Sequence, residues 1–229
     1  IKVNNIIIGK QYKSSENYEK FIKIVKEKKI NVKIVEGGEK VSIEDNLYFD
    51  IIWPFSDNMI SDNSINNNSL VCKLNYKNYS MLFTGDIEAI AEKAILKKYS
   101  KSLNILKSDI LKVAHHGSKT SSITEFIEKI KPKYAIIGVG EDNKFGHPSD
   151  STIQNLEKAN IRIYRTDKMG EIEMKTNGKE IKINEFLKTY TGNLVLNNDD
   201  PNVARLGKAN PDNQNVYYFS VDKYQFATE

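Results

Sequence analysis

The chain has 229 residues, with 34 basic and 30 acidic side chains and a formal net charge of +4. This length fits one large domain, or one domain with an appendage, and it allows a substantial hydrophobic core. The mild charge permits a nucleic-acid partner without requiring one. The single cysteine, Cys72, excludes an intramolecular disulfide. No apolar run approaches the roughly 20 residues that cross a bilayer, so no transmembrane segment is expected.

The apolar pattern predicts strands and helices that alternate along the chain. Residues 55–68 are polar and rich in turn residues, and they are expected to form a loop. Lys77 and Asn78 separate two apolar runs and predict a two-residue hairpin turn. The expected strands are 2–9, 30–34, 39–43, 47–52, 69–76, 79–84, 110–114, 134–139, 161–164, 171–175 and 180–183. The expected helices are about 15–28, the segment after Asp86, 122 to Pro132, and 151 to about 159.

Two capping boxes mark helix starts, Ser122-x-x-Glu125 and Ser151-x-x-Gln154. Alternation of strands and helices, with antiparallel hairpins at both ends, predicts an α/β fold with a mixed sheet. Residues 1–188 are expected to form this domain. Residues 189–229 are expected to be an appended tail or the start of a further module, with strands at 194–196 and 216–221. Cys72 lies in a predicted strand, which favours a buried packing role over catalysis.

Three polar residues follow predicted strands and are candidates for chemistry. Asp86 ends an apolar strand on a Gly-Asp turn, where it is either a helix N-cap or a ligand facing a pocket. His115 and His116 follow the apolar run 110–114, at a position where α/β sheets place their sites. Because successive strand residues point to opposite faces, one imidazole is expected to bind metal and its neighbour to support it, bind substrate or transfer a proton.

The remaining candidates lie in loops. His147 is either an exposed loop residue or a proton donor to a leaving group. Gly117 allows close backbone approach, and Ser118 with Lys119 offers a hydroxyl and a cation suited to a phosphate. Asn66 and Asn67 open the hairpin strand, either as a flexible turn or as part of the site.

Five motifs occur in one order: Asn-Asn-Asn-Ser-Leu-Val (66–71), Leu-Phe-Thr-Gly-Asp (82–86), Leu-Lys-Val-Ala-His-His-Gly-Ser (111–118), Gly-His-Pro (146–148) and Tyr-Arg-Thr-Asp (164–167). Over about residues 1–185 the chain resembles the metallo-β-lactamase-fold domain of ComEC-type competence proteins and related secreted hydrolases. The resemblance implies an αββα sandwich with a dinuclear site at one sheet edge.

By this resemblance, Asp86 corresponds to the carboxylate that bridges two metals. His115 or His116 corresponds to the next ligand. The resemblance makes His147 the later pocket histidine, and it puts Asn66 or Asn67 where other branches have a ligand histidine. The family's first ligand block, His-x-His-x-Asp-His, does not occur in this sequence. We expect it to precede Ile1, together with the first strands of the sandwich, because Ile1 is not an initiator methionine and the chain is a processed or trimmed piece.

The leading hypothesis is a metal-dependent phosphodiesterase that acts as a DNA nuclease and uses two divalent metals (Zn²⁺ or Mn²⁺). Its metal ligands would be Asp86 and His115 or His116, and its catalytic groups His116, His147 and Ser118. Lysines at 112, 119 and 144 would help hold a nucleic-acid backbone. The resemblance also implies an extracellular or cell-surface location. The alternatives are another hydrolase on this fold (phosphorylcholine esterase, lactonase or β-lactamase) and a metal-free, non-catalytic binding module.

Overall fold

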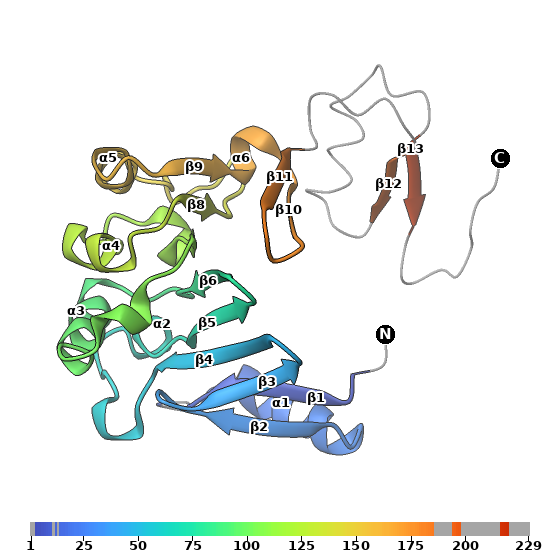
Figure 1. Cartoon of the computed structure of the whole chain (residues 1–229). Coiled ribbons are helices and arrows are strands. Elements are labelled where there is room, and N and C mark those ends of the chain that lie inside the picture. The colour runs from blue at the N-terminus through green and yellow to red at the C-terminus, as the bar shows by residue number, and fades with distance from the viewer. Residues whose placement is uncertain (1–2, 11, 13, 186–193, 198–215, 220–229) are drawn as a thin grey trace. The chain divides into compact units, whose positions relative to one another are not determined.

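The computed structural model describes residues 3–10, 12, 14–185, 194–197 and 216–219. Its main element is a seven-stranded sheet with the order β3-β4-β5-β6-β7-β8-β9 (Figure 1). Strands β3 to β6 pair antiparallel, whereas β6, β7 and β8 pair parallel. The expected α/β class with a mixed sheet is therefore confirmed. The strands are β3 (Lys40–Glu44), β4 (Leu47–Trp53), β5 (Val71–Tyr76), β6 (Tyr79–Phe83), β7 (Ile110–Lys112), β8 (Tyr134–Ile137) and β9 (Arg162–Arg165).

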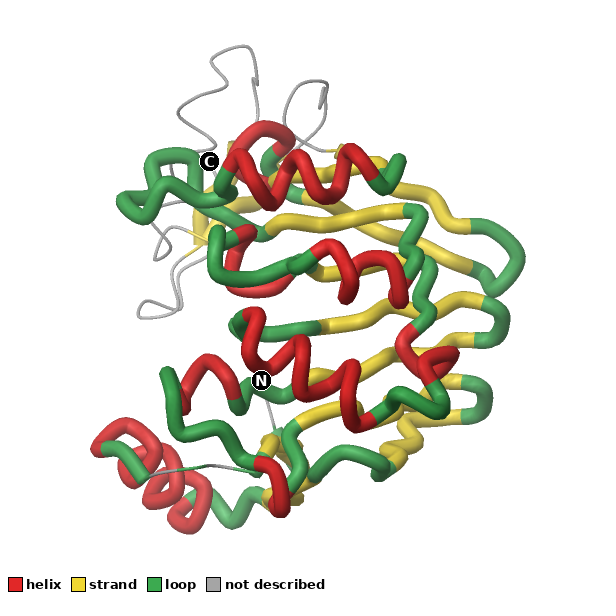
Figure 2. Tube along the Cα trace, turned by 90° about the vertical axis from the view of Figure 1, so that its left-hand side faces the viewer, coloured by secondary structure: helices red, strands yellow, loops and turns green. Residues whose placement is uncertain are grey.

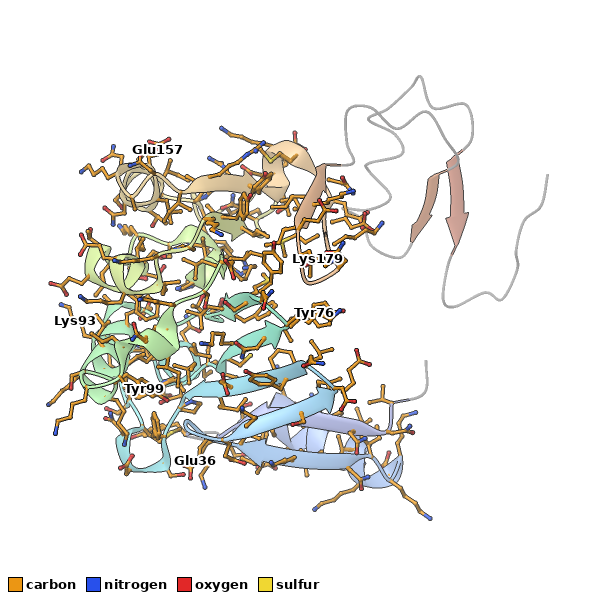
Figure 3. All side chains as sticks on the ribbon, viewed as in Figure 1. Glu36, Tyr76, Lys93, Tyr99, Glu157 and Lys179 are labelled. Carbon is orange, nitrogen blue, oxygen red and sulfur yellow. The ribbon has the colours of Figure 1, made fainter. Side chains whose placement is uncertain are left out.

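Helices α3 (Ala89–Lys98), α4 (Thr124–Ile130) and α5 (Asp150–Lys158) lie along the same side of this sheet (Figures 1 and 2). Their apolar side chains pack on the sheet and form the core, with the 3₁₀ helix η2 (Leu103–Leu106) beside them. Tyr99 follows α3 and is labelled in Figure 3, and its hydroxyl donates to the carbonyl oxygen of Ile52 at 3.2 Å. This bond satisfies a polar atom inside an apolar layer.

The predicted hairpin at 69–84 is confirmed. Strands β5 and β6 pair in a register that sets Cys72 opposite Phe83 and Tyr76 opposite Tyr79. Lys77 takes the positive φ of +51° that the tight turn needs. Burial raises the pKa of the Cys72 thiol to about 11, which disfavours the reactive thiolate. This agrees with the packing role expected for the cysteine.

A separate βαβ unit is formed by β1 (Asn5–Gly9), α1 (Glu16–Glu27) and β2 (Asn31–Val35). The two strands pair in parallel, from Asn5 opposite Asn31 to Gly9 opposite Val35. The helix begins after Ser15, whose hydroxyl accepts from the backbone N–H of Tyr18 at 3.2 Å. The helix predicted at about 15–28 is thus confirmed.

The polar composition of residues 55–68 predicted a loop, but the segment is partly helical. It contains a 3₁₀ turn, η1 (Ser56–Asn58), and a single helical turn, α2 (Ser64–Asn67). The buried amide of Asn68 organises the segment: its oxygen accepts from the Ile60 N–H at 2.9 Å, and its nitrogen donates to the carbonyls of Ile60 and Ser64, each at 2.7 Å. Asparagine side chains therefore replace backbone pairing here.

Both predicted capping boxes are wrong in detail. Helix α5 begins after Ser149, whose hydroxyl accepts from the Thr152 N–H at 3.3 Å. Helix α4 begins after Ile123, because Ser122 has a φ of +61° and an N-cap residue needs extended backbone. The buried carboxylate of Glu92, on α3, accepts from the N–H groups of Ser122 at 2.6 Å and Ile123 at 2.9 Å. A neighbouring helix supplies the cap that the local sequence was expected to provide.

The chain divides into two compact units, one of residues Ile1–Val139 with Lys144–Tyr164 and the other of Gly140–Asn143 with Arg165–Glu229. The second unit contains α6 (Thr166–Met169), the antiparallel hairpin of β10 (Ile172–Thr176) and β11 (Ile181–Glu185), and the parallel pair β12 (Leu194–Asn197) and β13 (Val216–Phe219). The predicted hairpin at 171–183 and the tail strand at 194–196 are confirmed, and the strand predicted at 216–221 is confirmed for 216–219, because residues 220 and 221 lie outside the described residues. The rest of the region 189–229 lies outside the described residues, and the boundary at residue 188 stays a prediction.

Within the described part of the chain, no helix combines the length and the apolar character needed to cross a membrane.

Candidate functional site

Three adjacent parallel strands deliver the candidate residues to one edge of the sheet. Strand β6 leads to Asp86, β7 leads to His115 and His116, and β8 leads to Gly138. Because the strands are parallel neighbours, the loops after them meet at the same edge, where open α/β sheets bind ligands. The loop after β8 continues to His147.

Asp86 lies in a tight turn after β6. Gly85 has a φ of +54°, and a Cβ there would lie 2.6 Å from the Cβ of Ser69, so only glycine fits this approach. The Ser69 hydroxyl accepts from the Asp86 N–H at 3.2 Å. Helix α3 has Glu88 as its N-cap residue, so the N-cap interpretation of Asp86 is wrong. The Asp86 carboxylate is instead 45% exposed and directed at His116, with 3.9 Å between Oδ1 and Nε2.

The two histidines follow a strand that is shorter than the one expected at 110–114. Strand β7 ends at Lys112, and a 3₁₀ turn, η3 (Ala114–Gly117), follows. His115 (φ +48°) and His116 (φ +54°) are both left-handed, and Gly117 (φ +80°) continues the run. Such backbone is uncommon for residues other than glycine and is concentrated at functional sites. Their side-chain directions therefore follow from this turn and not from strand alternation.

His116 is held in the orientation typical of a metal ligand. Its Nδ1 lies 2.6 Å from the carbonyl oxygen of Gly138. A carbonyl only accepts, so Nδ1 carries a proton, and Nε2 is the ring nitrogen directed toward Asp86. The side chain is 53% exposed, which leaves Nε2 accessible from solution. Metal-binding histidines commonly donate their second ring nitrogen to a carbonyl in this way.

His115 lies deeper, with 23% of its side chain exposed. Its Nε2 is 3.5 Å from the amide nitrogen of Asn66, and its Nδ1 is 3.7 Å from Oε1 of Glu88. The Nδ1 atom is buried and makes no hydrogen bond. The backbone N–H of His115 donates to the Gly85 carbonyl at 3.0 Å and so joins the histidine loop to the Asp86 turn. From this position His115 is better placed to hold the neighbouring residues of the site than to bind a ligand directly.

Glu88 belongs to the site but was missed by the sequence analysis. Its carboxylate accepts from the Thr120 hydroxyl at 2.9 Å and the Asn67 amide at 3.3 Å, besides lying near His115. The Asn67 oxygen accepts from the Glu88 N–H at 3.0 Å, so the two residues pair reciprocally. Asn67 is fully buried, and its carbonyl accepts from the Trp53 indole N–H at 2.8 Å. The signal available in the sequence was a second carboxylate two residues after Asp86.

Ser118 lies in the same loop but is 4% exposed. Its hydroxyl is 3.0 Å from that of Thr120, and its carbonyl accepts from the hydroxyls of Ser121 and Thr152, each at 3.0 Å. These contacts favour a structural role for Ser118, and its predicted catalytic role stays a prediction. Lys119, expected to pair with it at a phosphate, is exposed.

The His147 loop packs against the histidine turn. A Cβ on Gly117 would lie 2.5 Å from the Cβ of Pro148, and the Ser149 N–H donates to the Gly117 carbonyl at 2.9 Å. The rings of His115 and His147 are 5.7 Å apart between centroids, at 67°. Burial, and then the neighbouring His115 and His116, lower the pKa of His147. A lowered pKa favours the neutral imidazole at pH 7, which accepts a proton more readily than it donates one.

Lys112 ends β7 beside the site. Burial lowers the pKa of its amine, while the charge of Asp86 acts in the opposite direction. Its Nζ donates to the carbonyl of Val113 at 3.3 Å. Of the three lysines expected to hold a nucleic-acid backbone, Lys112 is thus partly buried, whereas Lys119 and Lys144 are exposed.

The candidate ligands number fewer than a complete metal site needs. Asp86 and His116 converge, and His115 and His147 lie behind them. Among the described residues, no group of three or more His, Cys, Asp or Glu side chains is arranged to hold a metal ion. The donor chemistry fits zinc or manganese, but these residues fit only part of a metal centre.

Comparison with known proteins found several relatives, one of them named a competence protein. The chain is 34% identical over 172 residues to ComE operon protein 3 of Bacillus subtilis, covering 75% of this chain and 21% of that protein. It is 30% identical over 129 residues to competence protein ComA of Neisseria gonorrhoeae, covering 56% of this chain and 18% of that protein. It is also 31% identical over 128 residues to recombination protein 2 of Haemophilus influenzae, covering 56% of this chain and 15% of that protein. The chain therefore spans about a fifth or less of the length of these relatives.

No family model matches the chain. A solved structure from Parabacteroides distasonis, provisionally named a metal-dependent hydrolase, is 15% identical with a TM-score of 0.43, covering 71% of this chain and 64% of that one. That similarity is too low to support an argument. The sequence matches confirm the resemblance to ComEC-type competence proteins, and the mixed sheet with helices along one side has the expected α/β class.

Proposed function

We propose that this chain forms part of a metal-dependent phosphodiesterase that cleaves DNA. The observation that carries the proposal is the convergence of Asp86 and His116, with 3.9 Å between Oδ1 and Nε2, at the carboxyl ends of parallel strands. Homology to competence proteins favours a nucleic-acid substrate over a lactam or lactone. The location that we propose for the activity is the cell surface or the outside of the cell.

The metal would be held by Asp86 and by Nε2 of His116, whose Nδ1 donates to Gly138. We place the further ligands in a His-x-His-x-Asp-His block before Ile1. A divalent metal bound there would polarise a phosphoryl oxygen and activate water at neutral pH. The two exposed side chains leave room for a substrate phosphate beside them.

The other residues of the site would hold these groups in place. Glu88, fixed by Asn67 and Thr120, flanks His115 and restrains the turn that carries His116. His147 lies next to His115, where it would exchange a proton with the substrate. The exposed amines of Lys119 and Lys144 would contact phosphates by charge.

The test uses the full-length protein that contains this segment. Metal content and cleavage of supercoiled plasmid are measured with Mn²⁺, with Zn²⁺ and after chelation, for the natural protein and for Asp86→Ala. Asp45→Ala, which changes an exposed turn carboxylate after β3, is the matched control. We expect about two metals per chain, cleavage that needs metal, and loss of both only in Asp86→Ala.

Other outcomes would redirect the proposal. Bound metal without plasmid cleavage would contradict the nuclease and point to another ester, such as a phosphorylcholine ester or a lactone. Absence of metal from the full-length protein would contradict hydrolysis altogether and leave a binding module.

A further inference from the structure

Two of the most exposed large apolar side chains flank the candidate site. In the described part of the chain, Phe145 and Ile65 are each 81% exposed, whereas other exposed large apolar side chains, such as Ile43, range from 39% to 55%. Ile65 precedes Asn66, which contacts His115, and Phe145 lies two residues before His147. A single exposed apolar residue is ordinary on a protein surface. Phe145 and Ile65 are each within two residues of a site residue in the sequence, and this makes them candidates for contact with a ligand.

The phenyl ring of Phe145 lies beside the imidazole ring of His147. The two rings are stacked, with 5.9 Å between centroids and 21° between planes. The His147 loop is itself anchored, because Ser149 donates to the Gly117 carbonyl and Pro148 packs against Gly117. With 81% of the residue exposed, the phenyl ring is open to solvent. Phe145 therefore presents a flat apolar surface at a fixed position beside the site.

The loop that carries Phe145 holds charges of both signs, because Glu141 and Asp142 precede Lys144. Lys144 is the neighbouring residue and is exposed, and Lys119 is exposed in the histidine loop. An aromatic face combined with cations that contact phosphates is the arrangement that binds single-stranded nucleic acids. A duplex keeps its bases stacked on one another, so an open ring of this kind would meet a base only in a single strand.

We infer that Phe145 is a stacking platform for a nucleobase of single-stranded nucleic acid, next to the phosphate bound at Asp86 and His116. This inference rests on the proposed phosphodiesterase and adds a substrate class to it. The His147 ring supports the phenyl ring from behind, and Lys144 contacts the backbone of the bound strand. Substrates that lack bases lose this contact.

Binding of nucleic acid is measured in the full-length protein that carries Asp86→Ala, so that the ligand is not cleaved. The ligands are a fluorescent single-stranded oligothymidylate, an abasic sugar-phosphate strand of the same length, and the duplex. Phe145→Ala is expected to weaken oligothymidylate binding about ten-fold and to leave abasic binding unchanged. Ile43→Ala, which shortens a 55% exposed side chain on β3, is the matched control and should change neither. Equal loss for the abasic strand, or an equal effect on the duplex, would overturn the inference.

A second variant, Phe145→Trp, reports stacking directly. Trp53, the single tryptophan among these 229 residues, is fully buried, and the emission of Phe145→Trp is read as the difference from the parent full-length protein. We expect oligothymidylate to quench this emission and the abasic strand to leave it unchanged. Quenching by both strands, or by neither, would contradict a stacked base.

Cleavage then separates this inference from the proposed function. If the natural protein hydrolyses the base-bearing and abasic strands equally and Phe145→Ala changes neither rate, the stacking inference is wrong while the phosphodiesterase stands. If neither strand is cleaved but base-dependent binding is lost in Phe145→Ala, the phosphodiesterase is wrong while stacking stands.

Discussion

The Nδ1 atom of His116 lies 2.6 Å from the carbonyl oxygen of Gly138, the first residue after β8. This bond joins the loops after β7 and β8 and directs Nε2 toward Asp86. His115, one residue earlier, has no such partner for Nδ1, which is buried beside Glu88. The two adjacent imidazoles therefore have different roles, one directed to solvent and one directed inward.

The two histidines should respond differently to substitution. His116→Gln removes the proposed ligand, so metal-dependent cleavage should fall by at least about 100-fold with weaker metal binding. His115→Gln should cost less, about ten-fold, because that residue supports the turn. Cleavage rates and metal affinity measured for both variants make the comparison. A larger loss of metal in His115→Gln than in His116→Gln would reverse the assignment.

Glu88 should be needed for activity although it faces the protein. Glu88→Gln keeps one acceptor oxygen and replaces the other with an NH2 donor, so either the Asn67 amide or the Thr120 hydroxyl loses its acceptor. We expect cleavage to fall about 10- to 100-fold, as for other residues that orient ligands. Glu125→Gln, at the exposed start of α4, is the control and should retain full activity. Retained activity in Glu88→Gln would show that this carboxylate is only structural.

Glu92 should make stability depend on pH. Burial raises its pKa to about 7 from 4.5, against the two backbone N–H groups that lower it. The folded state thus binds more protons than the unfolded state between these values, so stability falls as pH rises from about 4.5 to 7. The effect is on the order of 3 kcal/mol at most. Denaturant unfolding at pH 5 and pH 8 measures it, and Glu92→Gln should flatten this difference. If the difference in unfolding free energy between pH 5 and pH 8 were the same in that variant, groups other than Glu92 would cause it.

Gly117 should tolerate no side chain. In Gly117→Ala the new Cβ would lie 2.5 Å from the Cβ of Pro148, on backbone with a φ of +80°. We expect a loss of roughly 2–4 kcal/mol in unfolding free energy, from overpacking and from strain. Gly140→Ala is the control, because a Cβ there meets nothing within 4 Å. Thermal unfolding compares the two, and equal melting temperatures would contradict the close packing of the His147 loop.

Local sequence signals predicted the elements that local interactions determine. The hairpin of β5 and β6 follows from two apolar runs and a two-residue turn, and α1 follows from apolar spacing with Ser15 before it. The general position of the site was also predictable, because polar residues followed strands that proved to be parallel neighbours. The ordered motifs supplied the relationship to competence proteins.

Contacts between distant segments were not predictable in the same way. The cap of α4 comes from Glu92, thirty-one residues before Ile123, so the nearby Ser122 and Glu125 pointed to the wrong pair. Glu88 gains its role only when Asn67 and Thr120 fold against it. The left-handed backbone of His115 and His116 depends on the Gly85 and Gly138 contacts, which no local pattern encodes.

The run of left-handed residues at 115–117 has a consequence for how this segment can vary. A β-branched residue is poorly accommodated at such φ values, whereas asparagine, aspartate, histidine and glycine are tolerated best. At positions 115 and 116 the backbone geometry therefore limits which amino acids fit, before any requirement for metal binding or catalysis applies. A homologous domain that had lost its hydrolytic role would still be confined to this narrow set of amino acids, so histidines retained there would not by themselves distinguish an active enzyme from a descendant that only binds.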